Sequence, residues 1–284
     1  MLFAFDGTWN KDNPGNEHDT NVCWFANGYT EKSLYIPGVG TRFGILGQAV
    51  GGITGAGGRT RIDEAMRDLA INLETGDEII DVVGFSRGAA LAVHFCNQVE
   101  RRHGLPIRFL GIWDCVPSFG LASVDANIGW DLELPDNVVK CFHALALDER
   151  RQTFHLHRLN ANVIEAMQEG RLFELWFRGV HSDVGGGNDN AGLSSISLQW
   201  MLKKAAKHGL PISQEVLTAN ERRQRVNAAS AAPWYDLVKN PRRVVRWNDQ
   251  VHASVTFVGD RNNPPSGVVR IDHDGLEIGP FARP

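Results

Sequence analysis

The chain has 284 residues, of which 43% are hydrophobic and 22% are charged, and its formal net charge is −4. This balance is typical of a globular protein, and the length suits one large α/β domain better than several small ones. The slightly acidic charge excludes the basic footprint of a nucleic-acid-binding protein, so we expect no nucleic-acid partner.

Short apolar runs that end at glycine, proline or aspartate recur along the chain and alternate with stretches of helical periodicity. Strands are predicted at residues 2–5, 33–36, 79–85, 107–113, 138–147, 172–180 and 251–258. Helices are predicted at residues 61–73, 89–100 and 193–208. Residues 10–20 are expected to form a polar loop, and the glycine-rich residues 38–58 a loop, a closely packed helix or, over 42–58, a lid.

This order of strands and helices predicts an α/β fold, with a mostly parallel sheet and helices on both faces. We expect residues 1–215 to form the core of the domain, whose further assignment to the α/β-hydrolase type depends on the motifs below. Residues 216–284 are then a C-terminal appendage packed on the same domain, because residues 221–248 mix charge runs with alanine-rich and proline-containing segments.

The cysteines and the start of the chain bear on its compartment. Three of the four cysteines lie in apolar stretches, and none has CxxC or zinc spacing, so we predict buried free thiols and neither a metal nor a cofactor. They are Cys23, Cys96, Cys115 and Cys141. Met1 is followed at once by a strand-like run, without a basic segment or a bilayer-length apolar run, so we expect a cytoplasmic protein without a Sec signal. Export by a route that reads no Sec signal stays open.

Residues 84–88, with the sequence Gly-Phe-Ser-Arg-Gly, match the G-x-S-x-G pattern between a predicted buried strand and a predicted helix. In this turn the backbone of the serine is strained, and side chains two positions before and after it would collide with neighbouring backbone. Gly84 and Gly88 remove those side chains, and Ser86 is predicted to be an exposed nucleophile.

An oxyanion formed at Ser86 needs backbone donors. Because Ser86 begins a helix, the N–H of Arg87 points outward at the positive end of the helix dipole. The second donor is expected from the turn after the first strand, from the N–H of Gly7 or Thr8. Asp6 in that turn is either a residue that stabilises the turn or one that binds substrate.

A serine nucleophile needs a base, and the base needs an orienting carboxylate. In this fold the triad follows the order Ser, acid, His. His181 follows a strand within a glycine-rich loop and is the favoured base, with His252 as its rival. Asp114 ends the strand at 107–113 and is the favoured acid, with Asp148, at the end of the next strand, as its alternative.

Other polar residues near these positions are assigned as follows. Asp183 is expected either to bind substrate or to hold the loop that carries the base, and no ligand set supports a metal there. His143 lies inside an apolar strand, which favours a core histidine. His155 and His157 alternate on a polar stretch and are expected at the surface.

Six segments together resemble a known family. They are Phe5-Asp6-Gly7-Thr8-Trp9-Asn10, Tyr35-Ile36-Pro37-Gly38-Val39-Gly40-Thr41, Gly84-Phe85-Ser86-Arg87-Gly88-Ala89, Gly111-Ile112-Trp113-Asp114, His143-Ala144-Leu145-Ala146-Leu147-Asp148-Glu149 and Gly179-Val180-His181-Ser182-Asp183-Val184-Gly185-Gly186-Gly187. Over residues 1–200 the chain resembles the bacterial and fungal α/β-hydrolase family that includes the first family of type VI secretion phospholipase (lipase) effectors. The resemblance implies a Ser86–Asp114–His181 triad, and phospholipid ester hydrolysis in the secreted members.

The favoured function is a serine hydrolase that cleaves carboxylic esters, such as phospholipid acyl esters, through an acyl-enzyme. The alternative is a catalytically retired α/β-hydrolase scaffold that acts as a binding module. A phosphate-binding loop at Gly51–Gly58 is disfavoured because it lacks the Lys-Ser/Thr ending of a P-loop.

Beyond an ester or phospholipid substrate, the sequence allows contact with a membrane surface. Two arginine clusters, one at residues 222–225 and one at residues 242–246, are either solvated faces or patches that meet acidic head groups. An immunity or carrier protein is compatible with the resemblance, but the residues do not identify one.

Overall fold

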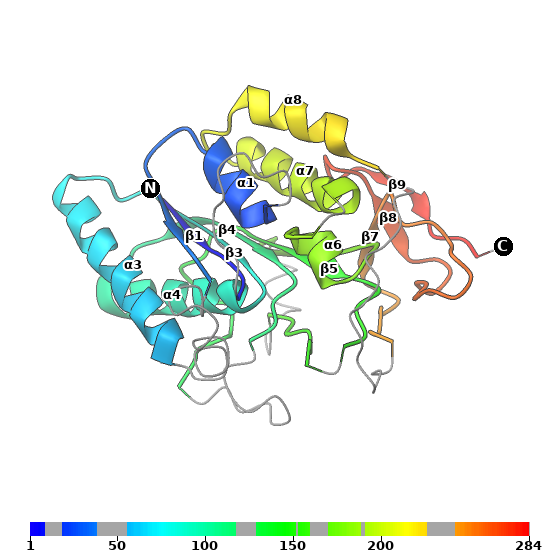
Figure 1. Ribbon diagram of the computed structural model, residues 1–284, viewed down its shortest axis with the longest axis horizontal. Helices are drawn as coiled ribbons and strands as arrows, with labels where there is room; N and C mark the ends of the chain where they lie inside the picture. The colour runs from blue at the N-terminus through cyan, green and yellow to red at the C-terminus, as the bar shows by residue number, and fades with distance from the viewer. Residues whose placement is uncertain are drawn as a thin grey trace.

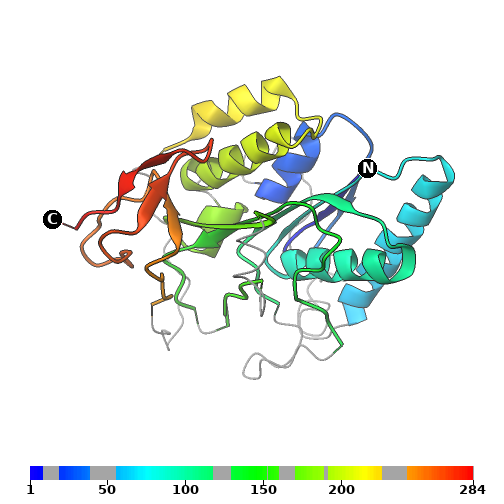
Figure 2. The same ribbon diagram turned by 180° about the vertical axis from the view of Figure 1, so that it is seen from behind.

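The computed structural model describes residues 1–8, 19–38, 56–117, 129–151, 153–159, 170–188, 191–225 and 242–283. In these parts of the chain a nine-stranded sheet has the order β2-β1-β3-β4-β5-β6-β7-β8-β9. Strands β1 to β8 pair in parallel and β9 is antiparallel to β8. Helices cover both faces of the sheet (Figures 1 and 2). The predicted α/β class with a mostly parallel sheet is confirmed.

The strands are β1 (Leu2–Phe5), β2 (Ser33–Ile36), β3 (Ile80–Phe85), β4 (Ile107–Trp113), β5 (Cys141–Ala146), β6 (Leu172–Phe177), β7 (Gln250–His252), β8 (Val269–Ile271) and β9 (Glu277–Pro280). The helices are α1 (Asn21–Gly28), α3 (Ala56–Glu74), α4 (Arg87–His103), α6 (His181–Gly185), α7 (Ala191–Lys207) and α8 (Gln214–Arg223). None of these helices is long and apolar enough to cross a bilayer.

The predicted strands of the core are all present, and three of them, at 2–5, 33–36 and 107–113, have the predicted bounds. The prediction missed α1, a two-turn helix that begins where the Thr20 side chain accepts a hydrogen bond from the N–H of Cys23. It also missed β8 and β9, which are only three and four residues long. The predicted lid at 42–58 lies outside the described residues except for its end, which belongs to α3.

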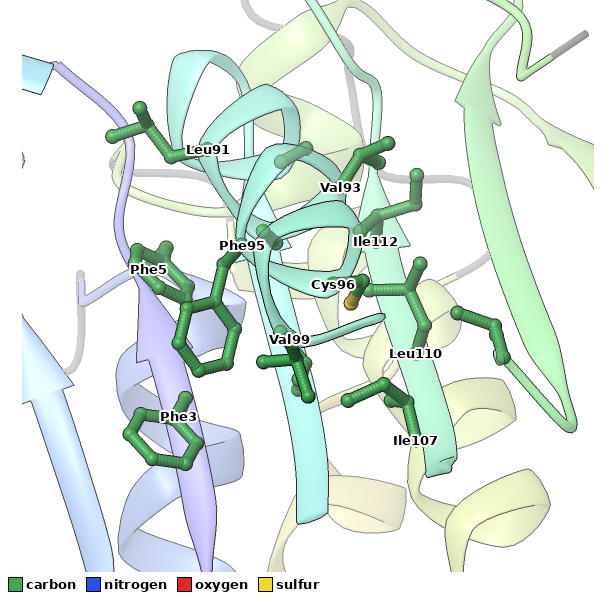
Figure 3. Close-up of a cluster of buried hydrophobic side chains, with 14 of the residues drawn as sticks. Phe3, Phe5, Leu91, Val93, Phe95, Cys96, Val99, Ile107, Leu110 and Ile112 are labelled. Carbon is green, nitrogen blue, oxygen red and sulfur yellow. The ribbon is translucent and has the colours of Figure 1, made fainter. Parts of the chain in front are cut away.

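Two hydrophobic layers hold the sheet between its helices. On one face α3 and α4 pack on β1, β3 and β4, and Figure 3 shows the centre of this layer. The ring of Phe95 on α4 lies 4.7 Å from that of Phe3 and 5.5 Å from that of Phe5. On the other face α1 and α7 cover the sheet around Phe109 and Trp113. Burial on both faces explains why β3 is a continuous apolar run.

The described residues of the C-terminal part continue the same sheet. Strands β7 and β8 extend it in parallel beyond β6, and α8 crosses the expected boundary at residue 215. A third hydrophobic cluster joins Val245, Val251 and Phe281 to Leu145 and Trp176 of the core strands. All four cysteines are buried and free, as predicted.

The strand register brings three polar residues to one edge of the sheet. Phe5 pairs with Gly84, and Phe85 pairs with Trp113. Because these strands are parallel, their carboxyl ends lie together, and the residues that follow them leave the sheet on the same side. Asp6, Ser86 and Asp114 are therefore neighbours at this edge.

Candidate active site

Ser86 occupies a strained turn between β3 and α4. Its φ is 59° and its ψ is −124°, and it is the N-cap residue of α4. A Cβ on Gly84 would lie 2.6 Å from the carbonyl oxygen of Gly88, and one on Gly88 would lie 2.2 Å from that of Phe5. No side chain fits at these distances, so both glycines are required for the turn, as the sequence predicted.

Ser86 and Asp114 share a rare backbone conformation. Asp114 has a φ of 40°, and among the described residues these two are the only non-glycine residues with positive φ. Such strain costs roughly 1–3 kcal/mol per residue and persists where the surrounding structure enforces it, which is often at a functional site. The N–H of Ser86 donates to the carbonyl of Trp113 at 3.0 Å, so the two strained turns are tied together.

The carboxylate of Asp114 is fully buried and receives four hydrogen bonds. Its Oδ2 lies 2.6 Å from Nδ1 of His181, and its Oδ1 accepts from the N–H of Ala146 at 2.8 Å. Arg243 donates to both oxygens, at 2.6 and 3.2 Å. Burial alone would raise the pKa of Asp114, but the charge of Arg243 and the hydrogen bond to His181 outweigh it and hold the pKa well below its usual range.

Arg243 was not predicted at this site. Its side chain is 9% exposed, and its guanidinium also donates to the carbonyls of Ala146 and Phe154, at 2.7 and 3.0 Å. It lies 129 residues beyond Asp114, in the stretch that the sequence indicated to be a linker or an appended subregion. A bidentate arginine is the strongest partner that a carboxylate finds in proteins.

His181 is the first residue of α6, and its ring is held on several sides. Phe85 and Phe154 lie 4.6 and 4.8 Å from it between ring centroids. Its backbone N–H donates to the buried carboxylate of Glu149 at 3.1 Å. Because Nδ1 is engaged with Asp114, Nε2 is the nitrogen left to exchange a proton with a nucleophile.

Glu149 holds the loop around His181 and was also missed by the sequence analysis. Its carboxylate is buried and accepts from the Arg151 guanidinium at 2.7 and 3.0 Å. Burial raises the pKa of Glu149, but the hydrogen bonds and charge of Arg151 bring it below its usual range. The Arg151 guanidinium lies 3.5 Å from the centroid of the Phe154 ring, which in turn packs on His181.

Asp183, expected at the substrate or in the loop, is fully buried and serves the loop. Its Oδ2 accepts from the N–H of Val180 at 3.0 Å, and its Oδ1 accepts from Asn188 at 3.1 Å. The first of these bonds caps the short helix that begins at His181. These bonds are those of a residue that holds the loop, which is one of its two expected roles.

Asp6 is likewise buried, and it organises the turn after β1. Its Oδ2 accepts from the hydroxyls of Thr20 and Tyr35, at 2.7 and 2.5 Å, and its Oδ1 accepts from the N–H of Gly7 at 2.6 Å. Burial raises the pKa of Asp6 to about 6, even though these hydrogen bonds act in the opposite direction. Of the two expected roles, the structure shows that of the turn-stabilising residue.

The predicted oxyanion donors lie on two neighbouring turns, the turn of Ser86 itself and the turn after β1. Arg87 is the first residue of α4, so its N–H is at the positive end of the helix. The N–H of Gly7 is occupied by Asp6, and it would have to leave that bond to reach an oxyanion. Thr8 follows in the same turn. A Cβ on Gly88 would lie 2.4 Å from the carbonyl oxygen of Asp6, which shows how closely the two turns approach.

The two alternative residues lie in other contacts. Asp148 accepts from Arg178 at 2.9 Å and from the N–H of Gly179 at 2.8 Å. His252 stacks on Phe177 with ring centroids 5.0 Å apart, and burial lowers its pKa to about 3. Neither of them contacts the Asp114–His181 pair through any bond in the described part of the chain.

His143 is a core histidine, as predicted, and it contacts the turn of Asp114 through the backbone of Cys115. Its Nε2 accepts from the N–H of Cys115 at 3.2 Å, and its Nδ1 lies 3.1 Å from Glu174 Oε1. Because Nε2 accepts from a backbone N–H, Nδ1 carries the proton and donates to Glu174. Glu174 is itself paired with Arg158. This buried network fixes the residue that follows Asp114.

A known protein family matches the chain. A family described as "T6SS, Phospholipase effector Tle1-like, catalytic domain" matches residues 1–105 and 92–204. The two overlapping matches span residues 1–204 of 284, which is more than half of the chain and includes all three predicted triad residues. No curated protein matches the chain.

Two solved structures are similar over most of the chain. One is the Tle1 effector bound to the VgrG spike from the type 6 secretion system, at 24% identity and a TM-score of 0.46, over 67% of this chain and 51% of that one. The other is an uncharacterized protein from Pseudomonas aeruginosa, at 20% identity and a TM-score of 0.51, over 81% and 51%. The chain thus spans about half the length, 51%, of these two proteins.

Proposed function

Because the chain belongs to the family of Tle1-like catalytic domains of type VI secretion phospholipase effectors, we propose that it is a serine hydrolase of carboxylic esters, with phospholipid acyl esters as its substrates. The single observation that carries this proposal is the 2.6 Å contact between His181 and Asp114 at the sheet edge where the strained Ser86 turn lies.

In the proposed reaction Ser86 Oγ attacks the ester carbonyl carbon while its proton passes to His181 Nε2. Asp114 keeps the proton of His181 on Nδ1 and stabilises the imidazolium that forms. The tetrahedral intermediate then breaks its bond to the alcohol oxygen, which leaves with the proton held by His181. The acyl group remains on Ser86 as an ester.

Water completes the cycle. His181 takes a proton from a water molecule, whose oxygen attacks the acyl carbon, and the collapse of the second intermediate returns that proton to Ser86 as the fatty acid leaves. In both steps the negative oxygen is stabilised by the N–H of Arg87 and by the turn of residues 6–8. The N–H of Thr8 suits this role best, because that of Gly7 is bound to Asp6.

Ser86→Ala tests the proposal directly. We expect it to lower kcat by about 10³-fold or more on p-nitrophenyl esters and on phospholipid vesicles, because the nucleophile is lost. Ser33→Ala, at an exposed serine that begins β2, is the matched control and should keep parental turnover. A fluorophosphonate should label the parent stoichiometrically and leave Ser86→Ala unlabelled.

Two outcomes would contradict the proposal. Ester hydrolysis by Ser86→Ala at the parental rate would mean that Ser86 is not the nucleophile. A folded parent that shows neither turnover nor labelling would favour the alternative, a retired scaffold that binds rather than cleaves.

A carrier belongs to the same proposal. The Tle1 effector is bound to the VgrG spike in its solved structure, and we propose a spike protein of that kind as the carrier of this chain. Co-purification of the chain with such a spike protein is the test, and the absence of a complex at micromolar concentrations would count against it.

A further inference from the structure

Residues 242–247, here called the Arg242–Trp247 strip, expose apolar side chains from a firmly held backbone. Trp247 is 84% exposed and Val244 is 75% exposed, the highest values among the large hydrophobic residues of the described chain. Burial alternates along the strip: Arg243 and Val245 point inward, whereas Arg242, Val244 and Arg246 are exposed. One face is therefore built into the protein and the other is presented to the surroundings.

The inward face anchors the strip at the proposed active site. Arg243 is bonded to both oxygens of Asp114, and Val245 packs into the third hydrophobic cluster. The carbonyl of Arg243 accepts from Asn262 at 2.8 Å, and the N–H of Arg246 donates to Asp249 at 2.8 Å. The exposed side chains are thus displayed next to the residue that orients His181.

The exposed face is cationic as well as apolar. Arg242 and Arg246 are both exposed, and among the described residues no carboxylate lies within 4.0 Å of either guanidinium. Arg242 instead donates to the carbonyl of Asp260 at 2.5 Å. This bond brings the strip beside the loop that exposes Phe257 and Val258, at 41% and 38%.

A tryptophan beside aliphatic side chains and arginines that have no carboxylate partner among the described residues is the composition of a membrane-interface contact. The indole ring prefers the head-group region, where its apolar body is buried and its N–H stays hydrated. Arginines near the surface are attracted to the negative potential of anionic lipids. Scattered apolar residues are common on protein surfaces, but here they coincide with free positive charge and with the edge of the proposed active site.

We propose that the Arg242–Trp247 strip docks the protein on an anionic phospholipid surface. Docking there places the edge of the sheet with Ser86 and Asp114 against the lipid whose esters the site would cleave, so this inference rests on the proposed function. The test below measures binding, and its result does not depend on whether Ser86 is a nucleophile.

Vesicle flotation of Ser86→Ala protein measures the docking, because this background leaves the lipid intact. The protein should float with vesicles of equal parts phosphatidylglycerol and phosphatidylcholine and much less with pure phosphatidylcholine. The double variant Arg242→Gln/Arg246→Gln removes two surface charges. It should lower the partition coefficient of the protein between anionic vesicles and buffer about 25-fold, roughly fivefold for each arginine. Trp247→Ala should weaken it about tenfold, and added salt should reproduce part of the arginine effect.

Arg222→Gln/Arg225→Gln is the matched control. It removes the same charge from the end of α8 and just beyond it, and Figure 1 draws α8 at the top, whereas the first orange residues, where the strip begins, lie lower on the right. Its partition coefficient should stay within about twofold of that of the parent. Circular dichroism and thermal melting confirm that every variant is folded.

Three outcomes would overturn the inference. The strip variants float as well as the parent, or the control loses binding to the same extent, or the parent associates with itself in solution and the strip variants abolish that association. The last outcome would assign the strip to a second copy of the chain. Loss of flotation in the strip variants alone supports docking even if no ester is ever cleaved.

Discussion

Asp6 follows β1 and Asp114 follows β4, the two strands that flank the Ser86 strand β3. Both residues lie at the carboxyl end of the sheet, and both carboxyl groups are buried. Among the described residues, the hydrogen bonds to Asp6 come from neutral groups, and its pKa is raised to about 6. Asp114 faces Arg243 and His181, and its pKa is held well below the usual range. Burial raises the pKa of both, and only a charged partner reverses the effect.

This difference assigns different roles to two similar residues. A triad acid must stay ionised while the imidazole beside it gains and loses a proton. Asp114 meets that requirement because Arg243 supplies a permanent positive charge. The partners of Asp6 within the described chain are a backbone N–H and two hydroxyl groups, and its contacts with Thr20 and Tyr35 suit it to shaping a turn.

The largest effect is expected from Asp114→Asn. It should lower kcat by about 10³- to 10⁴-fold on a soluble ester, because the amide cannot hold the proton of His181 on Nδ1. Asp148→Asn, at the end of the neighbouring strand, is the control and should keep activity within a few-fold, as it has no bond to His181. Equal losses in the two variants would contradict the assignment of Asp114.

The second effect concerns stability and pH at Asp6. Its pKa is higher in the folded chain, about 6, than its ordinary value of 3.8. A raised pKa contributes stability that is complete below about pH 4 and is lost as the pH rises through 6. The free energy of unfolding, measured with urea, should therefore fall in the parent relative to Asp6→Asn, by about 3 kcal/mol in total as the pH rises from below 4 to above 6. A difference that does not change with pH would refute the raised pKa.

The smallest effect is expected at Arg243. Arg243→Gln should lower kcat about tenfold with little change in KM, since Asp114 keeps its bonds to Ala146 and His181 but loses the charge. The pKa of Asp114 then rises, so the acidic limb of the pH–rate profile moves to higher pH. Arg243→Lys should restore most of that shift.

Arg178→Gln separates this effect from a general loss of packing. Arg178 is a similarly buried arginine that pairs with Asp148 at the next strand end. Its removal should lower the melting temperature without moving the pH profile. If Arg243→Gln behaves in the same way, Arg243 is only a structural residue.

Local patterns in the sequence were sufficient to predict strands β1 to β7, but not β8 and β9, and the parts of the site that depend on short-range chemistry. The apolar runs located β1, β3 and β4, and the glycines around Ser86 located the strained turn. His181 and Asp114 were favoured because each follows a strand end, and the structure pairs them at 2.6 Å. Their catalytic roles remain predictions that the variants above address.

The rest depended on contacts between distant segments. Nothing near Arg243 in the sequence points to a carboxylate 129 residues away. Glu149 belongs to one of the six segments that carry the family resemblance. Its bond to the backbone of His181, however, depends on how the ends of two strands lie relative to each other. Asp183 was expected either at the substrate or in the loop, and its bond to the N–H of Val180, which caps α6, depends on how that loop folds.

The position of Arg243 late in the chain also has a consequence for synthesis. A nascent chain that has emerged only as far as residue 204 contains the serine, the histidine and the aspartate, but not the cation that keeps this aspartate ionised. Without Arg243, the pKa of Asp114 loses the largest of the effects that lower it. The low pKa of this carboxyl group is therefore established only after residue 243 has been made and has folded onto Asp114.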